Sequence, residues 1–497
     1  MTSPARFLLA PLLLVLPLAL VLGQPDTARA QPLPALATDA ALATKIASVL
    51  NDSRVTRATV GVVVAESSTG TQLYGRSPTT AISPASNMKL VTSAAALDLL
   101  GPEYTFSTDV FAPAAAVNGV VNRLYLKGNG DPTLRESDLQ ALAAQVKAAG
   151  ITKVTDGVVG DGSYFDSDLY NNYWDGRDYN NAYAAQISGL TLSPSSAYAV
   201  GTVQVTYQPG TGKGAKAKLG VVPALAAGYV KLVNKTTTTA TGTGASISVH
   251  RTNHTNTITV SGRVALKRSL TKRTVTISNP ARYAAHVFTR VLRSAGIDVP
   301  AAPTTGTTPT ARVRVASDTS VPLSTIVTLL MKPSNNGMTE HLAKTLGRVG
   351  TKPGTWQAGA AAMRAWLGTT QTVPSTVVLV DGSGLAHRDT LTARVLVRLL
   401  QYAQTRPWFD TFYNALPVAG NPDPAIGGTL TDRMVGTAAA NNLHAKTGTL
   451  SGITALSGYV TDRSGRRYTF SMLGRYSSSS PRIVFDKLGA TLAGWTS

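Results

Sequence analysis

The chain has 497 residues, of which 43% are hydrophobic and only 14% charged, a composition that excludes a disordered protein and allows two or three domains with cores. It contains no cysteine, which excludes a disulfide framework, thiol catalysis and a cysteine-linked lipid anchor. Its net charge of +20 suits a polyanionic partner such as nucleic acid, a lipid surface or an anionic cell-wall polymer, although a charge that serves only solubility explains it equally well.

The first thirty residues have the pattern of a secretory signal peptide. Arg6 precedes an apolar run from Phe7 to Leu22, and Ala28-Arg29-Ala30 is a cleavage site of the A-x-A type before Gln31. Two prolines interrupt the apolar run, which is short for a membrane-spanning helix. We therefore predict a signal peptide over residues 1–30 and a secreted, extracytoplasmic protein of the cell wall. We also expect no stable membrane anchor and no nucleic-acid partner.

The next predicted elements lead to a candidate nucleophile. A short helix is predicted over residues 39–50, a buried strand over 58–66 and its hairpin partner over 71–74. Pro84 then precedes a predicted helix over residues 87–100. Ser86 falls at the start of this helix, and Lys89 shares its face three residues on, so a neutral Lys89 amine could take the proton of the Ser86 hydroxyl. Taken alone, S-x-x-K is a weak signal, because a capping serine followed by a solvated lysine gives the same pattern.

From about residue 106 to residue 315 the pattern changes to short Val/Thr/Tyr-rich strands between Gly, Asn and Asp turns. Strands 245–251 and 257–266 flank a hairpin signal, while residues 136–149 and 279–296 are predicted helices. We interpret residues 106–315 as one or two β-rich modules inserted into a domain whose two parts are residues 31–105 and 316–497.

The last part of the chain returns to longer helices and a final hairpin. Strands near both ends of the chain indicate one antiparallel sheet shared by the two termini. The predicted helices are 323–330, 337–346, 355–367 and 481–493, and the predicted strands are 377–380, 455–460 and 468–473.

Three short motifs follow one another in the chain: Ser86-x-x-Lys89, Ser334-x-Asn336 and Lys446-Thr447-Gly448. Each alone has an ordinary explanation, but the ordered set is typical of penicillin-binding proteins and class A β-lactamases. Around these motifs the chain resembles the class C low-molecular-mass penicillin-binding proteins, the D-alanyl-D-alanine carboxypeptidases/endopeptidases of peptidase family S13. The resemblance extends from about residue 40 to the C-terminus, and it is carried by segments 84–86, 130–134, 184–188, 381–385 and 445–449.

This resemblance implies an α+β fold: a serine β-lactamase/transpeptidase-like domain, with an antiparallel sheet flanked by helices, interrupted by a large β-rich insert. It also implies a serine DD-peptidase that cleaves the D-Ala-D-Ala terminus of peptidoglycan stem peptides and is acylated by β-lactam antibiotics. Ser86 is the implied nucleophile and Lys89 its base, with a pKa that burial and the nearby Lys446 should lower. The backbone N–H groups of Ser86 and Thr449 would form the oxyanion hole. Ser334 would pass a proton to the departing amine, and Asn336 would hold the donor peptide's amide. The terminal carboxylate would be bound by Lys446 with Thr447, Gly448 and Thr449.

The chain departs from the family pattern after Asp381-Gly382-Ser383-Gly384-Leu385, where the family usually has Ser-Arg. Here Ala386, His387 and Arg388 follow. Either Arg388 or His387 could bind a charged stem-peptide side chain, with Asp175 or Asp178 as the acidic partner. The alternative for these residues is a solvated loop.

Other functions are less well supported. A class A β-lactamase needs a deacylating glutamate between the second and third motifs, and the chain has no glutamate after Glu340, which we assign to the scaffold. A catalytically inactive peptidoglycan-binding scaffold is the other alternative. No H-E-x-x-H motif occurs, so we predict neither metal nor cofactor. The sequence leaves open the balance of carboxypeptidase and endopeptidase activity, the stem-peptide diamino acid, the oligomeric state and the role of the insert, whose Lys267, Arg268, Lys272 and Arg273 either bind a wall polymer or shape the cleft.

Overall fold

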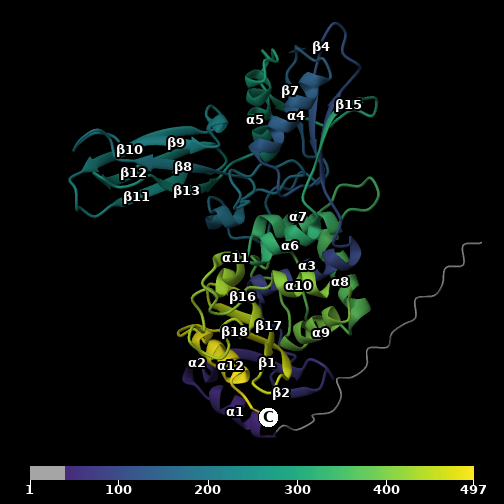
Figure 1. Cartoon of the computed structure of the whole chain (residues 1–497), viewed down its shortest axis with the longest axis vertical. Helices are drawn as coiled ribbons and strands as arrows, with labels where there is room; N and C mark the ends of the chain where they lie inside the picture. Colours follow the sequence, from purple (N-terminus) through teal and green to yellow (C-terminus); the bar gives the residue numbers. More distant parts are fainter. Residues whose placement is uncertain (1–39, 497) are drawn as a thin grey trace, which may run out of the picture.

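The protein is described here by a computed structural model that covers residues 40–496, so the predicted signal peptide lies outside the described residues. A five-stranded antiparallel sheet joins the two ends of the described chain in the lower body of Figure 1. Strand β1 pairs with β18 over its whole length, from Thr59 opposite Arg475 to Glu66 opposite Tyr468. The prediction that both ends of the chain share one antiparallel sheet is therefore confirmed. The strand order is β16 (His444–Leu450), β17 (Ile453–Thr461), β18 (Arg467–Arg475), β1 (Thr59–Glu66) and β2 (Gln72–Arg76).

Helices cover both faces of this sheet, and the side chains of its central strands are almost all buried. Along β1, Val60, Val62 and Val64 pack into the core that includes the terminal helices, whereas Val63 and Ala65 face helix α9 (Ala393–Gln404) on the other side. This alternation follows the two-residue period of a strand. The terminal helices are α1 (Ala40–Val49), α2 (Ser53–Thr56) and α12 (Arg482–Ala493).

Helix α3 (Met88–Leu99) runs through the interior of the body. Every side chain from Met88 to Leu97 is buried, including the amine of Lys89. A helix that is buried all round needs apolar neighbours on every side, and α3 finds them on the sheet and on five further helices. These are α6 (Leu323–Met331), α7 (Asn336–Leu346), α8 (Trp356–Thr370), α9 (Ala393–Gln404) and α10 (Phe409–Ala415).

Between α3 and α6 the chain leaves the body and forms the upper part of the molecule in Figure 1. Helices α4 (Glu136–Ala148) and α5 (Pro280–Ser294) share a core with a mixed sheet, so this unit is α/β and not purely β. The sheet order is β14 (Thr304–Thr305), β7 (Val158–Asp161), β5 (Leu124–Gly128), β3 (Ser107–Ala112) and β15 (Val313–Thr319), and β4 (Val120–Val121) pairs with β6 (Lys153–Val154) nearby.

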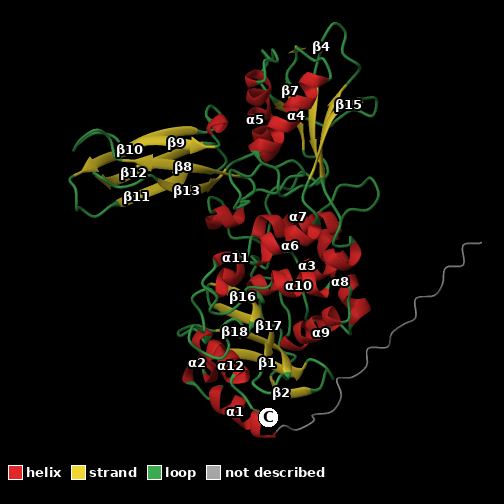
Figure 2. Cartoon of the chain, viewed as in Figure 1, coloured by secondary structure: helices red, strands yellow, loops and turns green. Residues whose placement is uncertain are grey.

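A separate lobe of strands projects to the side of that unit, as Figures 1 and 2 show. It consists of two three-stranded sheets, and the predicted hairpin of residues 245–266 is present as β11 and β12. The first sheet has the order β13 (Thr271–Thr276), β8 (Thr202–Gln208) and β9 (Lys218–Val222), and the second has the order β10 (Lys231–Thr239), β12 (Thr257–Ala265) and β11 (Ser246–Arg251).

One predicted element is wrong. Residues 377–380 do not form a strand: Val378 makes a single isolated bridge to Thr390, and the segment is otherwise a loop. Its apolar side chains are accounted for by packing under α8 and not by pairing in a sheet. The other predicted helices and hairpins are present with shifts of a few residues, and the fold class is the predicted one. In residues 40–496 no helix is long and apolar enough to cross a membrane. The remaining short turns of helix are η1 (Ala85–Asn87), η2 (Gly176–Asp178), η3 (Ala182–Ala184), η4 (Ala224–Ala226), α11 (Pro424–Gly427) and η5 (Gly428–Leu430).

Candidate active site

Ser86 lies in the tight turn η1 that leads into α3. The residue before it, Ala85, has a φ of 45°, a left-handed conformation that costs energy for a residue with a Cβ atom and is typical of functional turns. The turn is held from outside by close packing, because a Cβ atom added to Gly384 would come within 1.9 Å of the Ala85 carbonyl oxygen. Ser86 is half-buried, whereas its neighbours Ala85 and Asn87 are buried. The fold thus presents one accessible hydroxyl on an otherwise buried turn.

The Lys89 amine connects the first motif with two distant segments. Nζ lies 2.9 Å from Ser86 Oγ and 2.7 Å from Asn336 Oδ1, and it donates to the Ser383 carbonyl oxygen at 2.9 Å. The i to i+3 spacing of Ser86 and Lys89 therefore brings the two side chains into hydrogen-bond contact, as predicted. The other two partners lie about 250 and 290 residues further along the chain.

The second motif forms the entry to α7. Ser334 has a φ of 62°, Asn335 caps the helix by accepting from Met338 N, and Asn336 is the first helical residue. The Asn336 side chain bridges two groups: its Oδ1 accepts from Lys89, and its Nδ2 donates to the Tyr183 carbonyl oxygen at 2.9 Å. The structure thus joins Asn336 to Lys89 directly. Within the described chain no hydrogen bond links the Ser334 hydroxyl to this group.

The third motif lies on edge strand β16, which runs along the Ser86 turn. Asn87 Nδ2 donates to the Lys446 carbonyl oxygen at 3.0 Å, and the Thr447 and Thr429 hydroxyls lie 2.7 Å apart. Gly448 is required here, because an added Cβ atom would approach the Pro84 carbonyl oxygen to 2.6 Å. Lys446 and Thr447 are buried, whereas Thr449 is exposed at the open side of the turn.

Burial sets the proton affinity of both lysines. It lowers the pKa of Lys89 to about 7, although the carboxylates of Glu340 and Asp381 oppose the shift. The pKa of Lys446 is lowered well below its ordinary value by burial and, second, by the charge of Lys89. The expected contribution of Lys446 to the Lys89 pKa is not seen, because burial lowers this pKa against the two carboxylates and Lys446 is not among its causes.

Glu340, which the sequence assigned only to the scaffold, is a buried carboxylate that acts on the Lys89 amine through the loop after Asp381. Glu340 on α7 accepts from Trp356 Nε1 at 2.7 Å, from Gly382 N at 3.1 Å and from Ser383 N at 2.8 Å. Ser383 in turn accepts from Lys89 through its carbonyl oxygen. Glu340 thus fixes the loop that orients the amine. Burial and the neighbouring Asp381 raise the pKa of Glu340 to about 7, against the effect of its three N–H donors.

Replacing Glu340 by Gln is expected to lower the rate of Ser86 acylation about tenfold or more, because the new NH₂ group opposes one of the three N–H donors and leaves it unsatisfied. The loss of the carboxylate should also lower the Lys89 pKa further and move the acid limb of the pH–rate profile to lower pH. A pH profile of acylation measures both effects. The exposed Glu103→Gln is the matched control, and a profile that does not move would contradict a positioning role for Glu340.

The two proposed substrate-binding residues outside the motifs lie apart from this group. Asp175 is exposed, and both its carboxylate oxygens accept from the Arg177 guanidinium of the same loop. The Arg388 guanidinium lies over the Tyr173 ring, 4.8 Å from its centroid. In residues 40–496 no hydrogen bond links Asp175 or Arg388 to the Lys89 group. The alternative carboxylate, Asp178, comes closer, because it accepts from the hydroxyl of Tyr183 at 2.5 Å, and the carbonyl oxygen of Tyr183 contacts Asn336.

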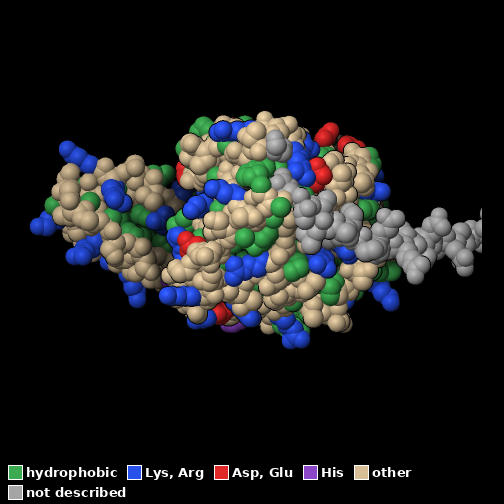
Figure 3. Space-filling model, turned by 90° about the horizontal axis from the view of Figure 1, so that it is seen from below, with side chains coloured by type: hydrophobic (Ala, Val, Ile, Leu, Met, Phe, Trp, Pro, Cys, Tyr) green, Lys and Arg blue, Asp and Glu red, His purple; other side chains and the backbone are tan. Residues whose placement is uncertain are grey.

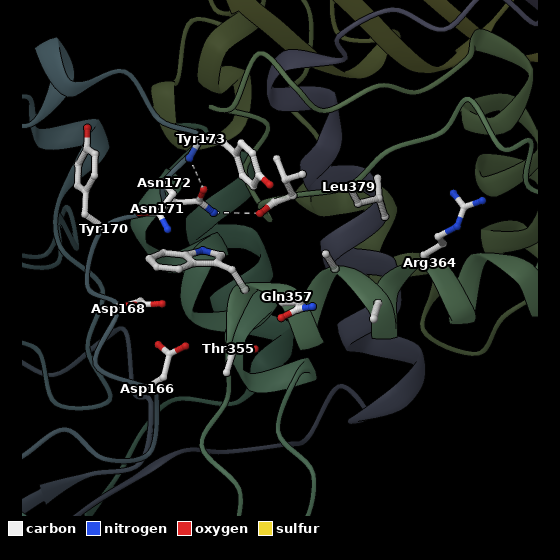
Figure 4. Close-up of a pocket in the computed structure, with 14 residues that line it drawn as sticks. Asp166, Asp168, Tyr170, Asn171, Asn172, Tyr173, Thr355, Gln357, Arg364 and Leu379 are labelled. Atoms are coloured by element: carbon white, nitrogen blue, oxygen red, sulfur yellow. Dashed lines mark hydrogen bonds between the residues drawn. The ribbon is translucent and has the colours of Figure 1, made fainter.

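A cleft of about 600 Å³ lies beside the group, between loop 166–173 and the first turns of α8 (Figure 4). Asp166 and Asp168 lie at one end and Arg364 at the other. The cleft adjoins the loop that supports Lys89, because Asn171 Nδ2 donates to the carbonyl oxygen of Val380, the residue before Asp381. The motif residues are not part of its lining. Among the described residues, His, Asp and Glu side chains do not gather in any group of three that could hold a metal ion.

Comparison with known proteins identifies the same family that the three motifs resemble. Residues 42–492 match the sequence profile of the D-Ala-D-Ala carboxypeptidase 3 (S13) family. The chain is 39% identical over 455 residues to the D-alanyl-D-alanine carboxypeptidase of Actinomadura sp. (strain R39), an alignment that covers 90% of this chain and 84% of that protein. It is 24% identical over 393 residues to D-alanyl-D-alanine carboxypeptidase DacB of Haemophilus influenzae, covering 78% of this chain and 79% of that protein.

The fold is also that of a solved relative. The crystal structure of penicillin binding protein 4 (dacB) from Haemophilus influenzae superposes with a TM-score of 0.75 at 22% sequence identity, covering 90% of this chain and 98% of that one. A match to the family profile over nearly the whole chain, together with 39% identity to a carboxypeptidase over most of both sequences, settles the classification: this chain is a member of the D-Ala-D-Ala carboxypeptidase 3 (S13) family of serine peptidases.

Proposed function

We propose that the protein is a secreted serine DD-carboxypeptidase that forms an acyl-enzyme on Ser86 and is inhibited by penicillin. The observation that carries this proposal is the contact between Ser86 Oγ and the Lys89 amine, 2.9 Å apart, where Lys89 is buried and has a pKa of about 7. At neutral pH a large share of Lys89 is then unprotonated and can act as a base. A solvated lysine with its ordinary pKa could not.

In the proposed reaction the neutral Lys89 amine takes the Ser86 proton while Oγ attacks the carbonyl carbon between the two D-alanines. The N–H groups of Ser86 and Thr449 stabilise the oxyanion. Ser334 passes a proton to the departing D-alanine nitrogen as the C–N bond breaks, which leaves an ester on Ser86. Water then attacks this ester, releases the shortened peptide and restores the hydroxyl. Asn336 holds the donor peptide's amide during these steps.

The terminal carboxylate of the substrate is the proposed partner of Lys446 and Thr447, with Gly448 and Thr449 completing the strand beside the scissile bond. Burial lowers the pKa of the Lys446 amine, and an incoming carboxylate would raise it again by favouring the protonated form. This arrangement selects a chain end, because only a free carboxylate supplies that charge. Cleavage of cross-links is a second proposed activity, since it breaks the same type of D-alanyl bond.

The peptidoglycan stem peptide is the proposed substrate, and its diamino acid side chain remains assigned to Arg388 and Asp175. Unlike the motif residues, these two contact Tyr173 and Arg177 and not the Lys89 group. We further propose a signal peptide over residues 1–30 and a transpeptidase-like domain of residues 31–105 and 316–497 that is interrupted by an insert of residues 106–315.

The test is intact mass after brief exposure to benzylpenicillin, together with D-alanine release from a peptide that ends in D-Ala-D-Ala. A lasting one-to-one adduct and release of D-alanine are the expected results. Rapid turnover of the drug without an adduct would instead identify a β-lactamase. An unmodified protein that releases no D-alanine but still sediments with peptidoglycan would identify the inactive scaffold.

The acylation rate should depend on pH with a single acid limb near pH 7. Lys89 acts as a base only in its neutral form, and burial lowers its pKa to about 7. The neutral fraction grows as the pH rises through this value, so acylation by benzylpenicillin should accelerate from pH 6 to pH 8. Stopped-flow measurement across this range checks the midpoint, and a rate that falls as the pH rises through 7 would contradict the role of Lys89.

A further inference from the structure

The positive charge of the protein is concentrated in one stretch of chain. Between Asp178 and Asp298 there are fourteen Lys and Arg residues and not one Asp or Glu, so this stretch carries fourteen of the twenty net positive charges. The rest of the chain has 32 basic and 26 acidic residues and is close to balanced. The solubility of the whole protein does not explain why the excess of basic residues is confined to one segment.

Eleven of these fourteen residues lie in residues 202–276, the two-sheet lobe formed by β8 to β13, which we call the basic lobe. One of the eleven, Arg251, is not exposed. Its guanidinium is buried and donates to Thr276, Ser278 and the Tyr179 carbonyl oxygen. The other ten are exposed, and the structure assigns none of their side chains a hydrogen bond or an ion pair within residues 40–496. They are Lys213, Lys216, Lys218, Lys231, Lys235, Arg263, Lys267, Arg268, Lys272 and Arg273.

The shape of the lobe spreads this charge over a large free surface. The lobe projects from the molecule in Figure 1, and in Figure 3 its visible face carries Lys and Arg side chains with no acidic side chain among them. Its apolar side chains, among them Val203, Val205, Ile258 and Val260, pack in the interior. The charged residues come from strands of both sheets and from the turns between them, so they are spread over the lobe and are not gathered in a pocket.

We infer that the basic lobe binds a linear polyanion with a phosphate in every repeat, a cell-wall polymer of this chemistry being the partner. Seven of its ten exposed cations are lysines, which bind phosphate as compact point charges without a fixed pairing geometry, and this suits a flexible polymer with a phosphate in each repeat. A regularly charged polymer can follow a positive surface that curves around a lobe, and it gains affinity from the counterions that it releases.

Two other partners fit the surface less well. Single-stranded nucleic acid is held by stacking of its bases on exposed aromatic rings. The lobe has no Trp or Phe, Tyr207 is buried, and Tyr229 is half-buried and packs against the Tyr283 ring. A membrane surface favours apolar side chains that enter the lipid, and Leu270 is the one large apolar side chain of the lobe that is strongly exposed in the described structure.

The test is binding of long-chain inorganic polyphosphate by the full-length mature protein, followed by titration calorimetry at low and at physiological ionic strength. We expect saturable binding that weakens steeply with salt. The variant Lys267→Gln/Arg268→Gln/Lys272→Gln/Arg273→Gln should bind at least about tenfold more weakly and with a shallower salt dependence. The control Lys45→Gln/Arg57→Gln/Arg463→Gln/Lys487→Gln removes the same charges from exposed sites on the body and should bind as the wild type does.

Benzylpenicillin acylation of both variants at the wild-type rate shows that they are folded. No saturable binding of polyphosphate, or an equal loss in both variants, would overturn the inference. Polyglutamate bound as tightly as polyphosphate would overturn the assignment to phosphate. Phosphatidylglycerol vesicles or single-stranded DNA bound more tightly than polyphosphate, in a way that depends on the four lobe residues, would replace the polymer by a lipid surface or a nucleic acid.

Discussion

Replacement of Ser86 by alanine is expected to abolish the benzylpenicillin adduct and to lower D-alanine release by about 10⁴-fold or more, as loss of a nucleophile does in other serine hydrolases. At the accessible end of α3, the Lys89 amine forms a hydrogen bond with the half-buried Ser86 hydroxyl. Ala85 and Asn87 on either side are buried. The other hydrogen-bond partners of Lys89 are the Asn336 amide and the Ser383 carbonyl, which are not nucleophiles.

Intact mass and D-alanine release measure this effect directly. The loss of one small hydroxyl should leave the thermal midpoint almost unchanged, because Ser86 lies at the edge of the core. Thr79→Ala, which removes an exposed hydroxyl a few residues earlier, serves as the control and should keep full activity. If the alanine variant still forms an adduct, a different residue is acylated, and peptide mapping of that adduct would identify it.

Replacement of Lys89 by methionine is expected to slow acylation by about 10³-fold, within the range that loss of a general base usually costs. Methionine fills a similar volume and has no amine, so Ser86 Oγ keeps its position but loses the group that can take its proton. The effect should be seen in the acylation rate with benzylpenicillin at saturating concentration, and the acid limb near pH 7 should disappear with the amine.

Lys344, another buried lysine, serves as a comparison for Lys89. Lys344 on α7 pairs with Asp166 at 2.6 Å and lies 4.0 Å from the centre of the Trp356 ring, so its role is to join α7 to the loop of the cleft. Lys344→Met leaves Asp166 unpaired and should lower the stability by about 3 kcal/mol, the lower range for a broken buried pair. Thermal melts should therefore separate the two variants: Lys89→Met loses rate and Lys344→Met loses stability. The reverse pattern would contradict both roles.

The sequence by itself determined the parts of the site that are close in the chain. Ser86 and Lys89 are three residues apart on a helix, a spacing that places their side chains on one face whatever the rest of the chain does. Likewise, apolar runs beside turn signals mark strands near the two ends of the chain, so their pairing into one sheet could be predicted. Residues 377–380 have the same apolar composition but no partner strand, and composition alone could not separate a strand from a buried loop.

Only the tertiary structure decided which distant groups complete the site. Ser383 binds the Lys89 amine through a backbone carbonyl, and a carbonyl is present at every residue, so no side-chain pattern marks it. Glu340 lies close to the second motif in sequence, but its role comes from three N–H donors on α8 and on the loop after residue 380. The proton affinity of Lys89 was likewise decided by burial against the pull of Glu340 and Asp381. Burial is a property of the packed core that assembles around α3, and the residues next to Lys89 in the chain do not determine it.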